Sequence, residues 1–208
     1  MGARGTAPSP SGAGAAAPAA PARGGPWQTG AVAGATGLRL AAAPAVMALC
    51  LAADYLAALL VFALAAATDY LDGYLARRWR VTTATGSFLD TTADKLLVTA
   101  ALVALVAVDR ASPWAAAAIV GREVMILGLR AAAASHGVVV VASQLGRVKA
   151  TVQFVAVAAS LYAAGPALGP LPLYQWLMWL AVALTILSAA DYLRRFSGVA
   201  TGRAEAPR

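Results

Sequence analysis

Charged residues are scarce in this chain. Only 12% of its 208 residues are Asp, Glu, Lys or Arg, whereas soluble domains carry about 25%. Because 61% of the residues are apolar, the composition excludes a disordered protein, a coiled coil and an ordinary soluble enzyme. The chain has one cysteine, Cys50, which excludes a disulfide within the chain and a cysteine-based metal site. This composition predicts a polytopic membrane protein.

Acidic residues are the scarcer of the two kinds of charge. Nine Asp and Glu stand against 16 Lys and Arg, which gives a net charge of +7. A nucleic-acid-binding module needs a hydrated basic face, and most of this chain has none, so we expect no nucleic-acid partner. An excess of Lys and Arg is instead typical of the cytoplasmic loops of membrane proteins.

The pattern along the chain predicts an all-α integral membrane protein with six transmembrane helices. Residues 1–28 form a predicted disordered tail rich in Ala, Pro and Gly, residues 29–196 the membrane domain, and residues 197–208 a short basic tail. Apolar stretches predict helices around 40–53, 55–68, 88–108 and 114–134, and two more within 150–190. The dipeptides Gly165-Pro166 and Gly169-Pro170 interrupt this last stretch, which predicts a helical hairpin.

Six helices put both termini on the same side, and the basic residues predict which side that is. Thirteen Lys and Arg lie on the predicted face that holds the termini, the 77–80 loop and the 130–149 segment. The opposite face holds only Arg110. This asymmetry predicts that both termini are cytoplasmic. The 13 are Arg4, Arg23, Arg39, Arg77, Arg78, Arg80, Arg130, Arg147, Lys149, Arg194, Arg195, Arg203 and Arg208.

Four of the nine acids cluster near the end of the second predicted helix and the start of the third. Asp69 and Asp72 are three residues apart, and Asp90 and Asp94 are four apart, so each pair shares a helix face. Because the connection is short, we expect the two helices to be antiparallel neighbours whose four carboxylates converge. Anions at membrane depth are costly, and one or two bound Mg²⁺ or Mn²⁺ ions would remove that cost.

Small residues and an arginine surround these carboxylates. Gly73, Ala76 and Gly86 leave clearance for a ligand close to the backbone. The planar guanidinium group of Arg77 can donate two parallel hydrogen bonds to a phosphate. Together these features predict a pyrophosphate site. The alternative interpretation is that the carboxylates are hydrated loop residues that pair with neighbouring basic side chains.

The full pattern is D-x2-D-G-x2-A-R-x8-G-x3-D-x3-D, from Asp69 to Asp94. It resembles the signature of the CDP-alcohol phosphatidyltransferases at every fixed position. The resemblance implies a six-helix membrane protein, usually a homodimer, with a two-metal site for a CDP-linked lipid on the cytoplasmic side. It implies that four aspartates bind the metal ions, namely Asp69, Asp72, Asp90 and Asp94. It also implies that Asp94 acts as the general base. Gly73 and Arg77 would contact the CDP group, with Ala76 and Gly86 beside them and Thr83 as a weaker candidate.

The remaining basic residues near or within helices predict an acceptor that carries its own phosphate. The candidate phosphate-binding residues are Arg39, Arg122, Arg130, Arg147 and Lys149. Residues 121–130 and 145–153 also resemble the R-E-x4-G-L-R and L-G-K-x-K-T-x2-Q stretches of the bacterial phosphatidylglycerophosphate synthase subfamily. That resemblance implies transfer of a phosphatidyl group from CDP-diacylglycerol to glycerol 3-phosphate, with CMP released, in the bacterial cytoplasmic membrane.

Other functions stay open at this point. A synthase of the same fold with another acceptor, either a cardiolipin synthase or a phosphatidylinositol phosphate synthase, would share the aspartate motif. A cation-coupled transporter or a membrane scaffold would also carry charges inside helices. A transporter is expected to have broken helices or repeats at mid-membrane, whereas the acids of this chain cluster near the predicted cytoplasmic boundary.

Overall fold

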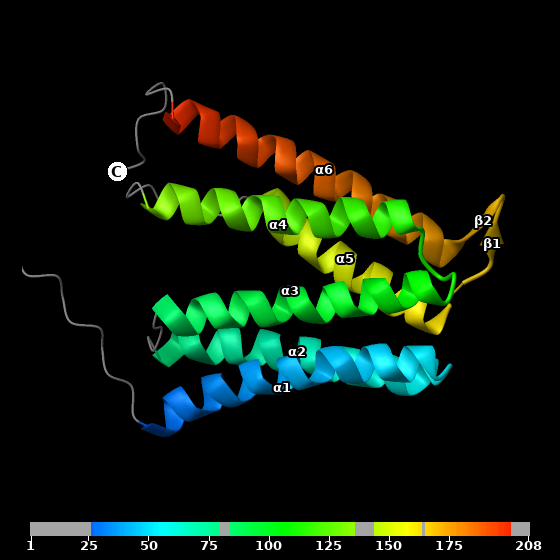
Figure 1. The fold of residues 1–208 in the computed structure, drawn as a ribbon, viewed down its shortest axis with the longest axis horizontal. Helices are drawn as coiled ribbons and strands as arrows, with labels where there is room; N and C mark the ends of the chain where they lie inside the picture. Colours follow the sequence, from blue (N-terminus) through cyan, green and yellow to red (C-terminus); the bar gives the residue numbers. More distant parts are fainter. Residues whose placement is uncertain (1–25, 80–83, 136–143, 164, 201–208) are drawn as a thin grey trace, which may run out of the picture.

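The computed structural model describes the backbone of residues 26–79, 84–135, 144–163 and 165–200. Within these ranges it describes the side chains of residues 34, 36–68, 91–133, 144–163 and 165–197. The described chain forms six helices and one small hairpin (Figure 1). The elements are α1 (Pro26–Leu51), α2 (Tyr55–Trp79), α3 (Ala84–Ala107), α4 (Pro113–Ser135), α5 (Gln144–Tyr162), β1 (Ala167–Leu168), β2 (Leu171–Pro172) and α6 (Leu173–Ala200).

The helices run alternately in opposite directions along one axis (Figure 1). The first residues of α1 and the last residues of α6 lie at the same end of the bundle. Helix α1 packs along both α2 and α3, α6 packs along α4 and α5, and α5 also contacts α2 and α3. The described residues contain six helices, as predicted, whereas their crossing of a membrane stays a prediction. The predicted tails lie mostly outside the described residues, and their boundaries stay predictions.

The core draws buried residues from all six helices, with the largest share from α3. Many of its buried residues are alanines, which let the helix backbones approach closely. Larger side chains fill the remaining space, and Phe62 of α2 stacks at a tilt against Phe154 of α5 with 5.5 Å between ring centroids. Val46 of α1 and Leu97 of α3 are fully buried. Close packing of this kind fixes the relative positions of the helices that carry the polar residues.

Local sequence explains the tight turns at the end of the bundle away from the termini. After α1, Ala53 has φ 61°, and the amide of Asp54 donates to the carbonyl of Leu49 at 2.9 Å, as in a Schellman turn. The Asp54 carboxylate then accepts a hydrogen bond from the amide of Ala57 at 3.2 Å, which caps the start of α2. One short segment therefore ends α1 and begins α2.

The interruption predicted between the last two helices is confirmed. Gly165 and Gly169 have φ of 98° and 68°, a conformation that suits glycine. A Cβ at Gly165 would lie 2.7 Å from side-chain atoms of Leu173, so this position has no room for a larger residue. The two-residue strands β1 and β2 pair antiparallel here, a detail that the Gly-Pro pattern does not predict.

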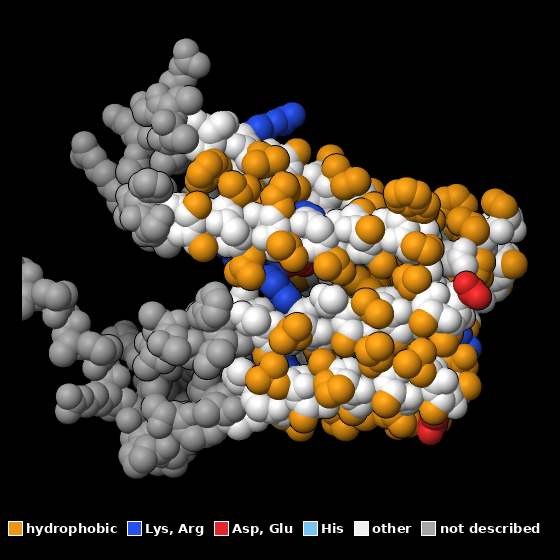
Figure 2. Space-filling model, in the orientation of Figure 1, with side chains coloured by type: hydrophobic (Ala, Val, Ile, Leu, Met, Phe, Trp, Pro, Cys, Tyr) orange, Lys and Arg blue, Asp and Glu red, His pale blue; other side chains and the backbone are white. Residues whose placement is uncertain are grey.

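The outer surface of the bundle is largely apolar. Figure 2 shows hydrophobic side chains across the visible faces of the described helices, and exposed residues include Leu56, Leu60, Leu64, Ile186 and Leu187. Among the described residues, one helix, Leu173–Ser197, is long and apolar enough to cross a membrane by length and composition. Thr36–Leu51 and Tyr55–Thr68 are shorter apolar helical stretches. An outward apolar surface is what a lipid environment requires.

Candidate active site

The backbone places the two aspartate-bearing segments in the halves of α2 and α3 that adjoin their connection. Asp69 and Asp72 lie in the second half of α2, and Asp90 and Asp94 lie in the first half of α3. Helix α2 ends where α3 begins (Figure 1), so the two helices are antiparallel, as predicted. The side chains of Asp69, Asp72 and Asp90 lie outside the described part of the structure, and their role as metal ligands stays a prediction.

The residues predicted to contact the CDP-lipid also lie outside the described side chains. These are Gly73, Ala76 and Arg77 on α2, Gly86 on α3, and Thr83 in the connection. The described side chains contain no group of three or more His, Cys, Asp or Glu arranged to hold a metal ion. Of the four motif aspartates, only Asp94 has a described side chain. A metal site formed by all four aspartates therefore stays a prediction.

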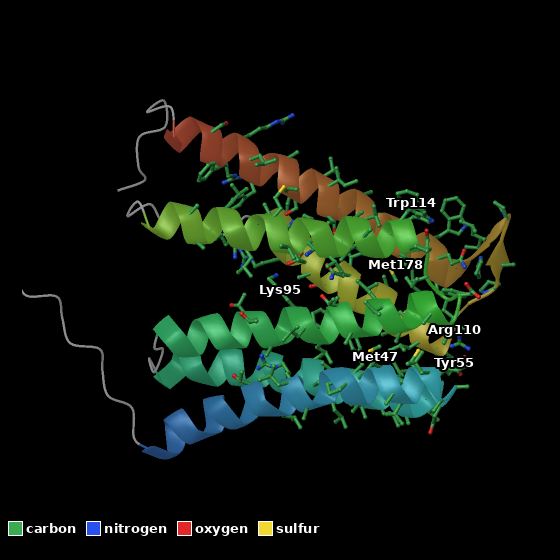
Figure 3. All side chains as sticks on the ribbon, viewed as in Figure 1. Met47, Tyr55, Lys95, Arg110, Trp114 and Met178 are labelled. Atoms are coloured by element: carbon green, nitrogen blue, oxygen red, sulfur yellow. The ribbon has the colours of Figure 1, made fainter. Side chains whose placement is uncertain are left out.

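Asp94 is the motif aspartate whose side chain is described, and it lines a pocket between α3, α4 and α5. Lys95, Glu123, Lys149 and Gln153 line the same pocket. Its other walls are Val98, Thr99, Leu102, Ile119, Val120, Ala150 and Phe154. Basic and acidic side chains are visible at a recess in the middle of the bundle (Figure 2), and Figure 3 labels Lys95 there. The predicted base therefore shares a pocket with two ammonium groups.

Glu123 of α4 is the centre of an ion-pair cluster beside this pocket. Lys95 of α3 donates to its Oε2, and Lys149 of α5 donates to its Oε1. The side chains of Glu123 and Lys149 are only 11% and 5% exposed, and that of Lys95 is 26% exposed. Ion pairs in such a setting need good geometry and full hydrogen bonding to offset their desolvation, and here one carboxylate connects three helices.

Arg122 extends the cluster to a fourth helix. Its Nη1 donates to Glu123 Oε1 at 3.0 Å, and its Nη2 donates to Ser188 Oγ of α6 at 2.8 Å. Ser188 is 1% exposed, so this contact lies in the interior between α4 and α6. Three cations thus surround one anion, which leaves the group of four side chains with a net charge of +2.

The structure gathers some of the predicted acceptor-binding residues and separates others. Arg122 and Lys149 meet at Glu123. Arg39 is completely buried on α1, outside the pocket lining. Arg130 is exposed and lies over the ring of Tyr192, 5.7 Å from its centroid. Arg147 is exposed as well. Of the five predicted residues, only Lys149 lines the pocket itself.

The predicted site omitted three residues that line the pocket and carry a charge or an amide: Lys95, Glu123 and Gln153. Lys95 directly follows Asp94, and the helical fold turns it toward Glu123, 28 residues further along the chain. Gln153 is 4% exposed, and its Oε1 has no hydrogen-bond partner among the described residues. It lies four residues after Lys149, hence on the same face of α5. That spacing is the signal that could have added Gln153 to the site.

Comparison with known proteins identifies the family of the chain. The sequence model of the CDP-alcohol phosphatidyltransferase family matches residues 33–187. A Bacillus subtilis (strain 168) protein named CDP-diacylglycerol–glycerol-3-phosphate 3-phosphatidyltransferase is 41% identical over 142 residues, which are 68% of this chain and 74% of that protein. A Sodalis glossinidius protein of the same name is 40% identical over 139 residues, 64% of this chain and 75% of its own.

The family match covers α3, α4 and α5 entirely, together with the aspartate motif and the pocket. The relatives named as phosphatidyltransferases align with most of the same region. The chain therefore belongs to the CDP-alcohol phosphatidyltransferase family and is an enzyme of that class.

Proposed function

We propose that this enzyme transfers the phosphatidyl group of CDP-diacylglycerol to glycerol 3-phosphate, producing phosphatidylglycerophosphate and CMP. The name shared by the Bacillus and Sodalis relatives supports this reaction. The observation that carries it is the pocket in which Asp94 lies beside Lys95 and Lys149. A hydroxyl acceptor needs a base, and an acceptor phosphate needs cations; this pocket supplies both.

Members of this family generally depend on a divalent metal. Asp69, Asp72, Asp90 and Asp94 would hold it, because hard carboxylate oxygens suit Mg²⁺ or Mn²⁺. The donor set suits such ions, since the four residues are all carboxylates and lie in the second half of α2 and the first half of α3. We propose two ions, which when bound neutralise the charge of the pyrophosphate.

Asp94 is the proposed general base. It accepts the proton of the acceptor hydroxyl while that oxygen bonds to the phosphorus that carries diacylglycerol. The bond from this phosphorus to the CMP oxygen breaks, and CMP leaves with the electron pair. No covalent intermediate with the enzyme is needed, since the acceptor attacks directly. The position of Asp94 in the lining of the pocket that the acceptor would enter supports this role.

The CDP-lipid is proposed to lie at the end of the bundle where α2 and α3 meet. Gly73, Ala76 and Gly86 would leave clearance for the pyrophosphate, Arg77 would bind a phosphate oxygen, and Thr83 would contact the nucleotide. The acceptor would enter from the adjacent pocket, with its phosphate on Lys149 and Lys95. Two phosphate-bearing substrates would then approach the motif aspartates from different sides.

The membrane arrangement is part of the proposal. Six helices would span the bacterial cytoplasmic membrane, with both termini and the active site on the cytoplasmic side, and two copies would form a homodimer. The apolar outer surface and the 13-to-one division of basic residues support it. The partners would be CDP-diacylglycerol, glycerol 3-phosphate and surrounding lipids, with no nucleic acid.

Release of CMP from purified protein tests the reaction. The protein in detergent is incubated with CDP-diacylglycerol, Mg²⁺ and one acceptor at a time: glycerol 3-phosphate, inositol phosphate or phosphatidylglycerol. We expect the fastest release with glycerol 3-phosphate. Equal or faster release with either other acceptor would assign the chain to one of the other synthases.

A further inference from the structure

Glu123 holds its two lysine partners by different oxygens. Lys95 donates to Oε2, and Lys149 donates to Oε1. Because both oxygens belong to one planar carboxylate, that carboxylate holds the two ammonium groups close to each other, one at each oxygen. The two lysines come from α3 and α5, and without a shared anion between them they would repel each other.

This arrangement of the two ammonium groups also suits a phosphate. Two oxygens of a phosphate lie about as far apart as those of a carboxylate, which is why both groups are bound by the same forked donors. Each ammonium group has three donors, so a bond to Glu123 leaves others directed elsewhere. Lys95 and Lys149 both line the pocket that contains Asp94. A phosphate in the pocket can therefore bridge the two lysines while Glu123 still holds them.

We propose that Glu123 is a positioning residue that sets Lys95 and Lys149 at the spacing required to bind the phosphate of the acceptor. This inference rests on the proposed function, because it takes glycerol 3-phosphate as the acceptor. Glu123 does not touch the reacting atoms. It acts through the two lysines, and Arg122 anchors it to Ser188 on α6.

Loss of the Glu123 charge has two opposing effects. It raises the net positive charge of the cluster, which by itself would attract a phosphate. It also leaves Lys95, Arg122 and Lys149 close together without their shared anion in a mostly buried site. The second effect dominates, since buried cations without a counter-ion are strongly unfavourable and move apart or lose their charge. The acceptor phosphate then meets lysines that are no longer correctly spaced.

Steady-state kinetics of Glu123→Gln test this proposal. We expect the KM for glycerol 3-phosphate to rise about tenfold or more, because the two lysines lose their common anchor. The KM for CDP-diacylglycerol and the kcat at saturating acceptor should stay within about threefold of wild type. A purely structural defect would instead lower kcat through the fraction of active protein and leave both KM values unchanged.

Asp191→Asn is the matched control. It neutralises a carboxylate that is ion-paired with Arg195 on the exposed side of α6, away from the pocket lining. It should change neither KM. An unchanged KM for glycerol 3-phosphate in Glu123→Gln would overturn the inference, whereas a wild-type enzyme that releases no CMP with glycerol 3-phosphate would overturn the proposed function instead.

A double variant keeps the test decisive if Glu123→Gln does not fold. Lys149→Gln combined with Glu123→Gln replaces a buried ion pair by two neutral amides. Glu123 still positions Lys95 when Lys149 is absent, so the double variant should have an acceptor KM about threefold or more above that of Lys149→Gln alone. Equal KM values for the two would contradict a positioning role.

Discussion

The guanidinium carbon of Arg110 lies 3.3 Å from the centroid of the Tyr55 ring. Arg110 also donates from Nη1 to the carbonyl oxygen of Leu161 at 2.6 Å. It thereby joins the start of α2, the connection between α3 and α4, and the end of α5 (Figure 3). Arg110 is the one basic residue that the sequence pattern puts on the face opposite the termini. Its contacts with Tyr55 and Leu161 give it a structural role on that face.

Replacement of Arg110 should destabilise the bundle without altering the chemistry. Arg110→Ala removes a cation–π contact and leaves the Leu161 carbonyl without its donor, so we expect the free energy of unfolding to fall by about 1–3 kcal/mol. Thermal unfolding in detergent measures this change. Tyr55→Phe keeps the ring and should be close to wild type. A stability of Arg110→Ala equal to that of wild type would show that these contacts contribute nothing.

Ala53 is a site where glycine should stabilise the protein. Its φ of 61° is unfavourable for a residue with a Cβ. Ala53→Gly should raise the free energy of unfolding by about 0.5–1 kcal/mol, because glycine adopts this conformation without strain. The matched control is Ala63→Gly in the exposed middle of α2. This substitution should lower the free energy of unfolding by about 1 kcal/mol. Urea or thermal unfolding should therefore show shifts of opposite sign for the two variants.

Asp94→Asn should abolish turnover while the donor lipid still binds. The amide cannot accept the acceptor proton, so we expect CMP release to fall by about 10²-fold or more. Binding of CDP-diacylglycerol, measured by protection against thermal unfolding, should largely persist. Full activity in this variant would exclude Asp94 as the base.

Asp69→Asn should act on the metal rather than on proton transfer. Loss of one carboxylate ligand should raise the concentration of Mg²⁺ needed for half-maximal activity and weaken binding of CDP-diacylglycerol at the same time. A titration of activity against Mg²⁺ measures the first effect. An unchanged metal requirement would remove Asp69 from the proposed ligand set.

Lys149 and Arg147 test which predicted basic residues bind the acceptor. Lys149 lines the pocket and Arg147 is exposed. Lys149→Gln should therefore raise the KM for glycerol 3-phosphate by about tenfold, since it removes a charge-assisted hydrogen bond, and Arg147→Gln should raise it less. The reverse order would mean that the acceptor phosphate lies outside the described pocket.

The sequence predicted the helices well because apolar runs and Gly-Pro breaks are local signals. The third predicted helix, 88–108, corresponds to α3 at Ala84–Ala107, and the fourth, 114–134, to α4 at Pro113–Ser135. The position of α1 against both α2 and α3 could not be predicted, because it depends on which alanine-rich faces pack together. No local sequence pattern indicates which of these helix faces pack against each other.

The candidate site was predicted in part for the same reason. The Asp69-to-Asp94 motif has fixed spacing and is visible in the sequence alone. The cluster around Glu123 is not, since Lys95 and Lys149 lie 28 and 26 residues from it along the chain and meet it only after α3, α4 and α5 pack. Because charged residues are rare in this chain, those within helices are easily noticed in the sequence. Only the fold shows which of them form ion pairs.

Transfer of radiolabelled glycerol 3-phosphate into lipid tests the central claim most directly. The purified protein is incubated in vesicles with CDP-diacylglycerol and Mg²⁺, the lipid is extracted, and label and CMP are counted, with Asp94→Asn as the inactive control. We expect labelled phosphatidylglycerophosphate and CMP in equal amounts from the wild type, and about 10²-fold less or still less of both from the variant. CMP release without label in the lipid, or equal label incorporation by Asp94→Asn, would contradict the central claim.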